Sequence, residues 1–144
     1  MKYSDAIITW MSYIRQPGKR KLIQIAKELK NREGLEVGGP SSFFGLRGGF
    51  PVYLFAERVD GVNFSTNTVW EGTIREGTHY EYYPGKLGNQ YIAEAADLSI
   101  VPDNEYDFLL SCHSLEHVAN PIKAMREWNR VLKTGGMLVL VLPD

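Results

Sequence analysis

The sequence contains a single cysteine, Cys112, so no disulfide bond can form within the chain. We therefore expect a reducing compartment, the cytoplasm, and we interpret Cys112 as a small buried hydrophobic residue at a strand end. No run approaches 18 apolar residues, so no segment is expected to span a membrane. Residues 1–12 also lack the basic region, apolar run and cleavage site of a secretory signal peptide.

The sequence has no excess of either charge. It contains 16 lysines and arginines against 17 aspartates and glutamates, which gives a formal net charge of -1. Such a chain has no overall field that attracts polyanions, so neither nucleic acid nor a membrane is an expected partner. Its 144 residues suit one domain. We divide them into an N-terminal helical segment, residues 1–33, and a single domain, residues 34–144.

Hydrophobic periodicity predicts two helices in the N-terminal segment. The first presents Ile7 and Met11 on one apolar face. The second presents an apolar stripe that begins at Leu22, and we expect Gly34 to end it because glycine readily adopts the left-handed conformation of a helix end.

Five short strands are predicted in the rest of the chain. They cover residues 35–37, 58–64, 90–95, 106–112 and 137–142. The last two are almost wholly apolar, as expected for strands buried on both faces. Between them a helix is predicted to begin at Pro121 and to end at Gly135–Gly136. This alternation indicates a parallel α/β sheet. Residues 43–57 are interpreted as an ordered loop rich in glycine and aromatic residues, whereas residues 65–89 give no clear assignment.

Polar residues and glycines follow the predicted strands. In a parallel α/β sheet, ligands bind beyond the carboxyl ends of the strands, near the point where the strand order reverses. The residues at those positions are therefore candidates for a binding site. They are Glu36, Gly38 and Gly39 after the first strand, Asn63 after the second, Glu94 after the third, and Ser111 and His113 after the fourth.

Residues 94–143 resemble the second half of the core of class I S-adenosylmethionine-dependent methyltransferases of the type 11-like group. The matching pieces, in chain order, are Glu94-Ala95, Asp97-Leu98, Tyr106-Asp107, Leu115-Glu116-His117 and the run from Arg130 to Gly136. Residues 35–42, with the sequence LEVGGPSS, resemble the first glycine motif of that family, so the resemblance covers residues 34–143. It implies a Rossmann-like parallel sheet with the strand order 3-2-1-4-5 and two leading helices. Relative to the full family fold, two strands are expected to be missing after the fifth.

The resemblance also implies a cofactor, S-adenosyl-L-methionine, and the transfer of its methyl group to an acceptor. The implied cofactor-binding residues are Glu36, Gly38 and Gly39 at the methionine end, Asn63 at the ribose, Glu94, Ala95 and Asp97 near the adenine, and Ser111 at the end of the fourth strand. Methyl transfer requires alignment above all, and it requires a general base only if the acceptor arrives protonated. His113 is the first candidate for that base and His117 the second. We expect a small-molecule or glycan-type acceptor.

Two departures from the family pattern favour an alternative. Asn63 replaces a carboxylate, and Pro40 and Ser42 occupy positions where the motif has glycines. A catalytically inactive or truncated methyltransferase-like module for binding or assembly is therefore the second hypothesis.

A third hypothesis comes from residues 113–117, which fit the H-x-x-E-H signature of a group of zinc peptidases. A zinc site would require His113 and His117 on one helical face. Because His113 directly follows an apolar strand and Pro121 lies four residues beyond His117, we expect no metal.

The fifth predicted strand, residues 137–142, has no charge, proline or glycine. At the open edge of a sheet, such a strand presents unpaired amides and carbonyls to other chains. We therefore expect a homodimer formed through this strand.

Overall fold

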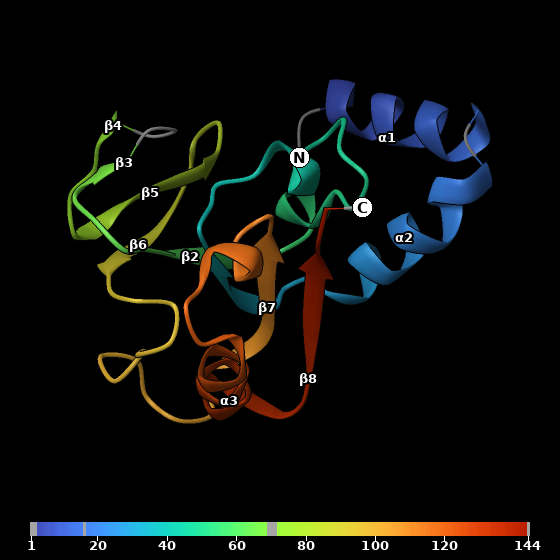
Figure 1. The fold of residues 1–144 in the computed structure, drawn as a ribbon. Helices are drawn as coiled ribbons and strands as arrows, with labels where there is room; N and C mark the ends of the chain where they lie inside the picture. Colours follow the sequence, from blue (N-terminus) through green and yellow to red (C-terminus); the bar gives the residue numbers. More distant parts are fainter. Residues whose placement is uncertain (1–2, 16, 69–71, 144) are drawn as a thin grey trace.

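The computed structural model describes residues 3–15, 17–68 and 72–143, and Figure 1 shows their arrangement. The helices are α1 (Tyr3–Arg15), α2 (Pro17–Glu28) and α3 (Pro121–Val131), with short 3-10 turns η1 (Ser42–Phe44), η2 (Val52–Leu54) and η3 (Leu115–His117). The strands are β1 (Glu33–Val37), β2 (Arg58–Asn63), β3 (Asn67–Thr68), β4 (Gly72–Thr73), β5 (Gly77–Tyr83), β6 (Lys86–Ile92), β7 (Tyr106–Cys112) and β8 (Leu132–Val141). None of the described helices is both long and apolar enough to cross a membrane.

The main sheet has the order β5-β6-β2-β1-β7-β8. Its strands β6, β2, β1, β7 and β8 pair in parallel, and β5 pairs antiparallel with β6 at the outer edge. The α/β class with a mostly parallel sheet is therefore confirmed. The predicted order 3-2-1-4-5 differs from the observed one because residues 77–83, which the sequence left unassigned, form an additional strand. The expectation that two strands are missing after the fifth stays a prediction.

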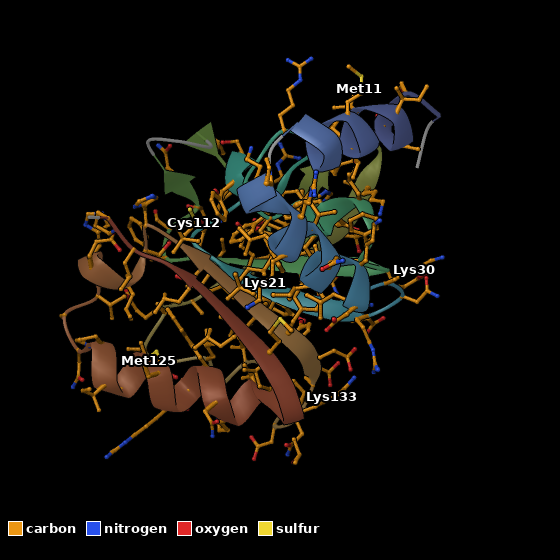
Figure 2. All side chains as sticks on the ribbon, turned by 90° about the vertical axis from the view of Figure 1, so that its right-hand side faces the viewer. Met11, Lys21, Lys30, Cys112, Met125 and Lys133 are labelled. Carbon is orange, nitrogen blue, oxygen red and sulfur yellow. The ribbon has the colours of Figure 1, made fainter. Side chains whose placement is uncertain are left out.

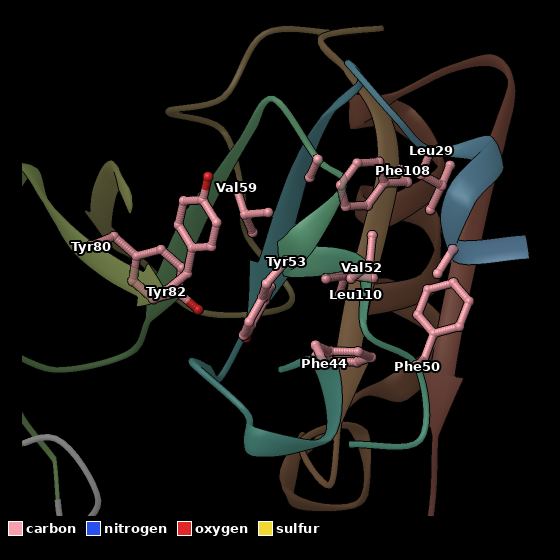
Figure 3. Packing of buried hydrophobic residues seen from close by; sticks show 12 residues of the cluster. Leu29, Phe44, Phe50, Val52, Tyr53, Val59, Tyr80, Tyr82, Phe108 and Leu110 are labelled. Carbon is pink, nitrogen blue, oxygen red and sulfur yellow. The ribbon is translucent and has the colours of Figure 1, made fainter. Parts of the chain in front are cut away.

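Two apolar cores cover the two faces of this sheet. Figure 2 shows α2 and α3 on opposite sides of β8. The first core packs Ala26 of α2 and Leu29, which directly follows α2, against Phe108 and Leu110 of β7. Figure 3 shows the aromatic side chains that the loops and β5 add to it. The second core lies under α3, whose fully buried Trp128 contributes the largest side chain.

The predicted helix ends were wrong at both glycine positions. Helix α2 ends at Glu28, and the chain turns at Asn31, which has a φ of 60°. Gly34 lies inside β1, where an added Cβ would be 2.0 Å from the ring of Phe108, so its role is close packing. Helix α3 ends at Val131 and continues directly into β8, which contains the predicted Gly135–Gly136 stop.

The apolar face predicted for the N-terminal helices points partly outward. Ile7 is 57% exposed and Met11 is 38% exposed, and Figure 2 shows Met11 directed away from the sheet. In α2, Ile23 is buried and the predicted stripe residue Leu22 is 38% exposed. Periodicity thus found both helices. It placed Ile7 and Met11 of α1 on the wrong face, whereas in the second stripe Ala26 and Leu29 are buried as expected and only Leu22 is exposed.

Candidate functional site

A cavity of about 590 Å³ lies at the carboxyl ends of β1, β2 and β7. This volume is in the range of sites for small molecules and cofactors. The lining residues are Val37, Gly38, Val62, Asn63, Phe64, Ala93, Glu94, Ala95, His113, Ser114, His117, Val118 and Ala119. The cavity therefore brings together six residues that the sequence predicted for the site, namely Gly38, Asn63, Glu94, Ala95, His113 and His117.

Asn63 ends β2 and contributes a polar group to the apolar wall of this cavity. Its side chain is buried, and its Nδ2 donates a hydrogen bond of 3.1 Å to the carbonyl oxygen of Gly39. This bond sets the orientation of the amide and leaves Oδ1 as an acceptor. Among the described residues, this buried Oδ1 has no hydrogen-bond partner. An ionised carboxylate at position 63 could not donate a hydrogen bond to the carbonyl oxygen of Gly39. The amide of Asn63 can, and it thereby holds the loop that follows β1.

Gly38 forms the turn where β1 leaves the sheet. Its φ of 80° is left-handed, and an added Cβ would lie 2.1 Å from the Oγ of Ser114. That hydroxyl donates to the carbonyl oxygen of Val37 at 3.0 Å, so it is held in place. The turn therefore requires glycine both for its backbone conformation and for space.

Glu36 lies behind this turn and outside the cavity lining. Its carboxylate is completely buried and accepts hydrogen bonds from the hydroxyls of Tyr53 and Tyr80, the latter at 2.7 Å. The backbone amide of Ser41 also donates to it at 3.0 Å. Gly39 fits against this group, because an added Cβ would be 2.2 Å from the Glu36 carboxyl carbon. These contacts give Glu36 a structural environment that the sequence did not predict.

The two tyrosines keep their protons in this environment. Burial raises the pKa of Tyr53 and of Tyr80 above the ordinary value, and the negative charge of Glu36 raises both further. Their hydroxyls therefore act as donors to the carboxylate, which partly compensates for its removal from water.

The loop after β6 forms another wall of the cavity and is held by α3. The indole nitrogen of Trp128 donates to the carbonyl oxygen of Ala95 at 2.9 Å. The guanidinium of Arg130 donates to the carbonyl oxygens of Leu98 and Val101 at 2.8 and 3.0 Å. Helix α3 thus fixes the path of the segment that includes Ala95.

Asp97 and Ser111 do not line the cavity. Asp97 is exposed and accepts a hydrogen bond from the backbone amide of Ser99, and hydrogen bonding to Ser99 lowers its pKa. Ser111 is completely buried at the end of β7, and its Oγ has no hydrogen-bond partner among the described residues. Their roles in cofactor binding stay predictions.

His113 and His117 both line the cavity. His113 directly follows β7 and has a φ of 52°, which is uncommon for a residue with a side chain. His117 ends the 3-10 turn η3, so the two histidines do not share a helical face as the zinc-peptidase hypothesis requires. Within the described residues, no group of three or more metal-binding side chains could hold an ion.

Most of the apolar part of the lining was not predicted from the sequence. Phe64 is 57% exposed beside the cavity, and Val118 and Ala119 contribute from the segment before α3. The position of Phe64 directly after Asn63 was the available signal, since residues that follow a parallel strand reach the ligand edge of the sheet.

Comparison with known proteins gives consistent results. The methyltransferase domain family matches residues 44–140 of the chain. The sequence is 35% identical over 72 residues to the ubiquinone/menaquinone biosynthesis C-methyltransferase UbiE of Hydrogenovibrio crunogenus, a match that covers 49% of this chain and 28% of that protein.

Two solved structures show a similar fold. A protein of Bacillus halodurans C-125 assigned as a methyltransferase has a TM-score of 0.60 at 21% identity, over 85% of this chain and 49% of that one. A SAM-dependent methyltransferase of Aquifex aeolicus has a TM-score of 0.51 at 19% identity, over 92% of this chain and 69% of that one. The chain thus spans about half the length of the Bacillus protein and 28% of the curated relative.

Proposed function

Because the chain belongs to the family of class I S-adenosylmethionine-dependent methyltransferases, we propose that its cavity binds S-adenosylmethionine and that it transfers the methyl group to a small-molecule or glycan-type acceptor. The observation that carries this proposal is the buried, unpartnered Oδ1 of Asn63, a residue that lines the cavity. An acceptor atom in that state is costly unless a ligand supplies a donor, and a ribose hydroxyl is such a donor.

The residues around Asn63 fit the rest of the cofactor. The glycine turn at Gly38 leaves space for close approach of the methionine part, and Phe64 offers an exposed aromatic side chain beside Ala93 and Ala95 for the flat adenine. Bound S-adenosylmethionine supplies an electrophilic methyl group on a positively charged sulfur. The chain aligns an acceptor with that group, and alignment can contribute several kcal/mol to the reduction of the barrier. The nearly balanced charge of the chain supports a small or neutral acceptor rather than a polyanion.

We expect S-adenosylhomocysteine to bind with a micromolar dissociation constant and to raise the melting temperature. Ligand at about 100 times the dissociation constant stabilises the folded state by about 2.7 kcal/mol. Calorimetric titration and thermal unfolding measure the two effects. Asn63→Leu, which removes the acceptor atom, should weaken binding by about ten-fold, equivalent to about 1.4 kcal/mol.

The matched control is Asn67→Leu, which makes the same change at an exposed residue of β3 outside the cavity. It should leave the affinity unchanged. No thermal shift of the unmutated chain at millimolar ligand would contradict the cofactor proposal.

A binding or assembly module without cofactor is the second candidate. The environment of Glu36 favours this second candidate. The family resemblance implies that the Glu36 carboxylate contacts the methionine end of the cofactor, but this carboxylate already accepts hydrogen bonds from Tyr53 and Tyr80. The same titration separates the two functions, since only the methyltransferase should bind S-adenosylhomocysteine.

We also propose that the chain forms a homodimer through β8. In the described sheet β8 pairs only with β7, and its side chains from Met137 to Val141 are half-buried between the two cores. Its other edge therefore presents backbone groups that a second copy can pair.

We expect sedimentation equilibrium to show a dimer, and Leu140→Lys to shift it to monomer or to insoluble protein because the lysine brings a charge into the half-buried strand. Ile122→Lys adds the same charge at an exposed position of α3 and should leave the dimer intact. A monomer at high concentration of the unmutated chain would refute the proposal.

A further inference from the structure

The backbone at His113 holds its side chain at the cavity in an uncommon conformation. The backbone amide donates to the carbonyl oxygen of Val141 at 3.0 Å, which ties this residue to the end of β8. Together with the left-handed φ of 52°, this hydrogen bond fixes the direction in which the His113 side chain leaves the backbone. Strained backbone of this kind persists where the surrounding structure enforces it, and it is concentrated at functional sites.

Glu116 approaches His113 from the adjacent 3-10 turn. Its Oε1 lies 3.6 Å from the Nδ1 of His113. The turn that carries it is closed by hydrogen bonds from the amides of His117 and Val118 to the carbonyl oxygens of Ser114 and Leu115, both at 3.1 Å. The Glu116 side chain is 26% exposed and that of His113 is 55% exposed.

This pair is poorly explained as a source of stability. Ion pairs between side chains this exposed contribute little to folding. The arrangement instead matches a base and its orienting carboxylate, because His113 lines the cavity and Glu116 does not. Hydrogen bonds in such sites are often long before ligands bind and shorten afterwards, so 3.6 Å is compatible with this role.

We propose that Glu116 is a positioning residue that keeps a proton on Nδ1 of His113, so that Nε2 stays unprotonated and accepts a proton from a hydroxyl group of the acceptor. The inference rests on the proposed methyl transfer and specifies its acceptor as an O–H compound. His113 lines the cavity and its side chain is 55% exposed, so the ring is accessible to a ligand.

The reaction balances with these groups. The acceptor oxygen forms a bond to the methyl carbon while its O–H bond breaks and the proton moves to Nε2 of His113. The electron pair of the broken C–S bond returns to sulfur, which becomes a neutral thioether. The imidazolium is stabilised by Glu116 and then releases its proton to water, to which its partly exposed ring has access.

The tautomer of His113 tests this inference without a known acceptor. The chain has three histidines, and His79 on β5 is exposed and serves as an internal reference. Proton–nitrogen NMR spectra of histidine labelled with nitrogen-15, recorded at mildly alkaline pH, distinguish Nδ1–H from Nε2–H. We expect His113 to show the Nδ1–H pattern and His79 the Nε2–H pattern of an unconstrained ring. Signals are assigned with His→Gln variants of each histidine.

Two variants of Glu116 complete the test. Glu116→Ala should cause loss of the Nδ1–H pattern of His113, whereas Glu116→Gln keeps an acceptor oxygen and should retain it. S-adenosylhomocysteine affinity should be the same in both, since Glu116 is outside the cavity lining. The inference is overturned if His113 matches His79 in the unmutated chain, or if Glu116→Ala leaves its pattern unchanged. Absence of S-adenosylhomocysteine binding together with an intact Nδ1–H pattern would refute the proposed function and leave the positioning role standing.

Discussion

Replacement of Glu36 by alanine is expected to lower the free energy of unfolding by about 3–5 kcal/mol, which is the range for removal of one partner from a buried charged network. The substitution leaves the buried hydroxyls of Tyr53 and Tyr80 without their acceptor. Each unsatisfied buried group costs about 1–3 kcal/mol, so the predicted loss is a large part of the stability of a small domain. Urea unfolding monitored by circular dichroism measures it.

Glu33→Ala on the same strand is the matched control. Glu33 is partly exposed and pairs with Arg58 at 3.3 Å, so its removal should cost less than about 1 kcal/mol. A small effect of Glu36→Ala, similar to that of Glu33→Ala, would show that the carboxylate does not stabilise the turn after β1.

Replacement of Gly38 by alanine is expected to weaken S-adenosylhomocysteine binding by at least about ten-fold, because a Cβ would displace the Ser114 hydroxyl and occupy the cavity wall. The left-handed backbone adds a cost of about 1–3 kcal/mol to folding. Calorimetric titration measures the affinity, and urea unfolding measures the stability.

Gly85→Ala separates these two effects. Gly85 has a φ of 78°, close to that of Gly38, but an added Cβ there would meet no atom within 4 Å. This control should lose stability through backbone strain and keep its ligand affinity. Equal affinity of the two variants would contradict the placement of the ligand beside Gly38.

The sequence predicted those elements whose signal is local. The apolar run of β7 and the start of α3 at Pro121 were located correctly, since burial on both faces and proline in a first helical turn leave a clear pattern. Strand β5 was not predicted. Its polar and aromatic residues become a strand through pairing with β6 and through burial of Tyr80 and Tyr82, which are tertiary effects.

In the candidate site, too, the features with a local sequence signal were predicted and those that depend on tertiary contacts were not. The rule that ligands bind beyond the carboxyl ends of parallel strands singled out Gly38, Asn63 and His113, and these three residues line one cavity. It could not predict the environment of Glu36, because the tyrosines that bind it lie 17 and 44 residues further along the chain. Nor could it predict the contact of Glu116 with His113, which depends on a 3-10 turn after the strand.

The contact between Glu36 and Tyr80 has a consequence for the order of folding. Glu36 in β1 precedes Tyr80 by 44 residues, so its carboxylate can gain this hydrogen bond only once the chain as far as β5 is present. Because β5 becomes a strand by pairing with β6 and by burying Tyr80 and Tyr82, we expect the hydrogen bonds around Glu36 to be complete only after these two strands have docked. We therefore expect the cavity to reach its final form through a long-range closure, although most of its lining lies in segments that follow the carboxyl ends of the strands.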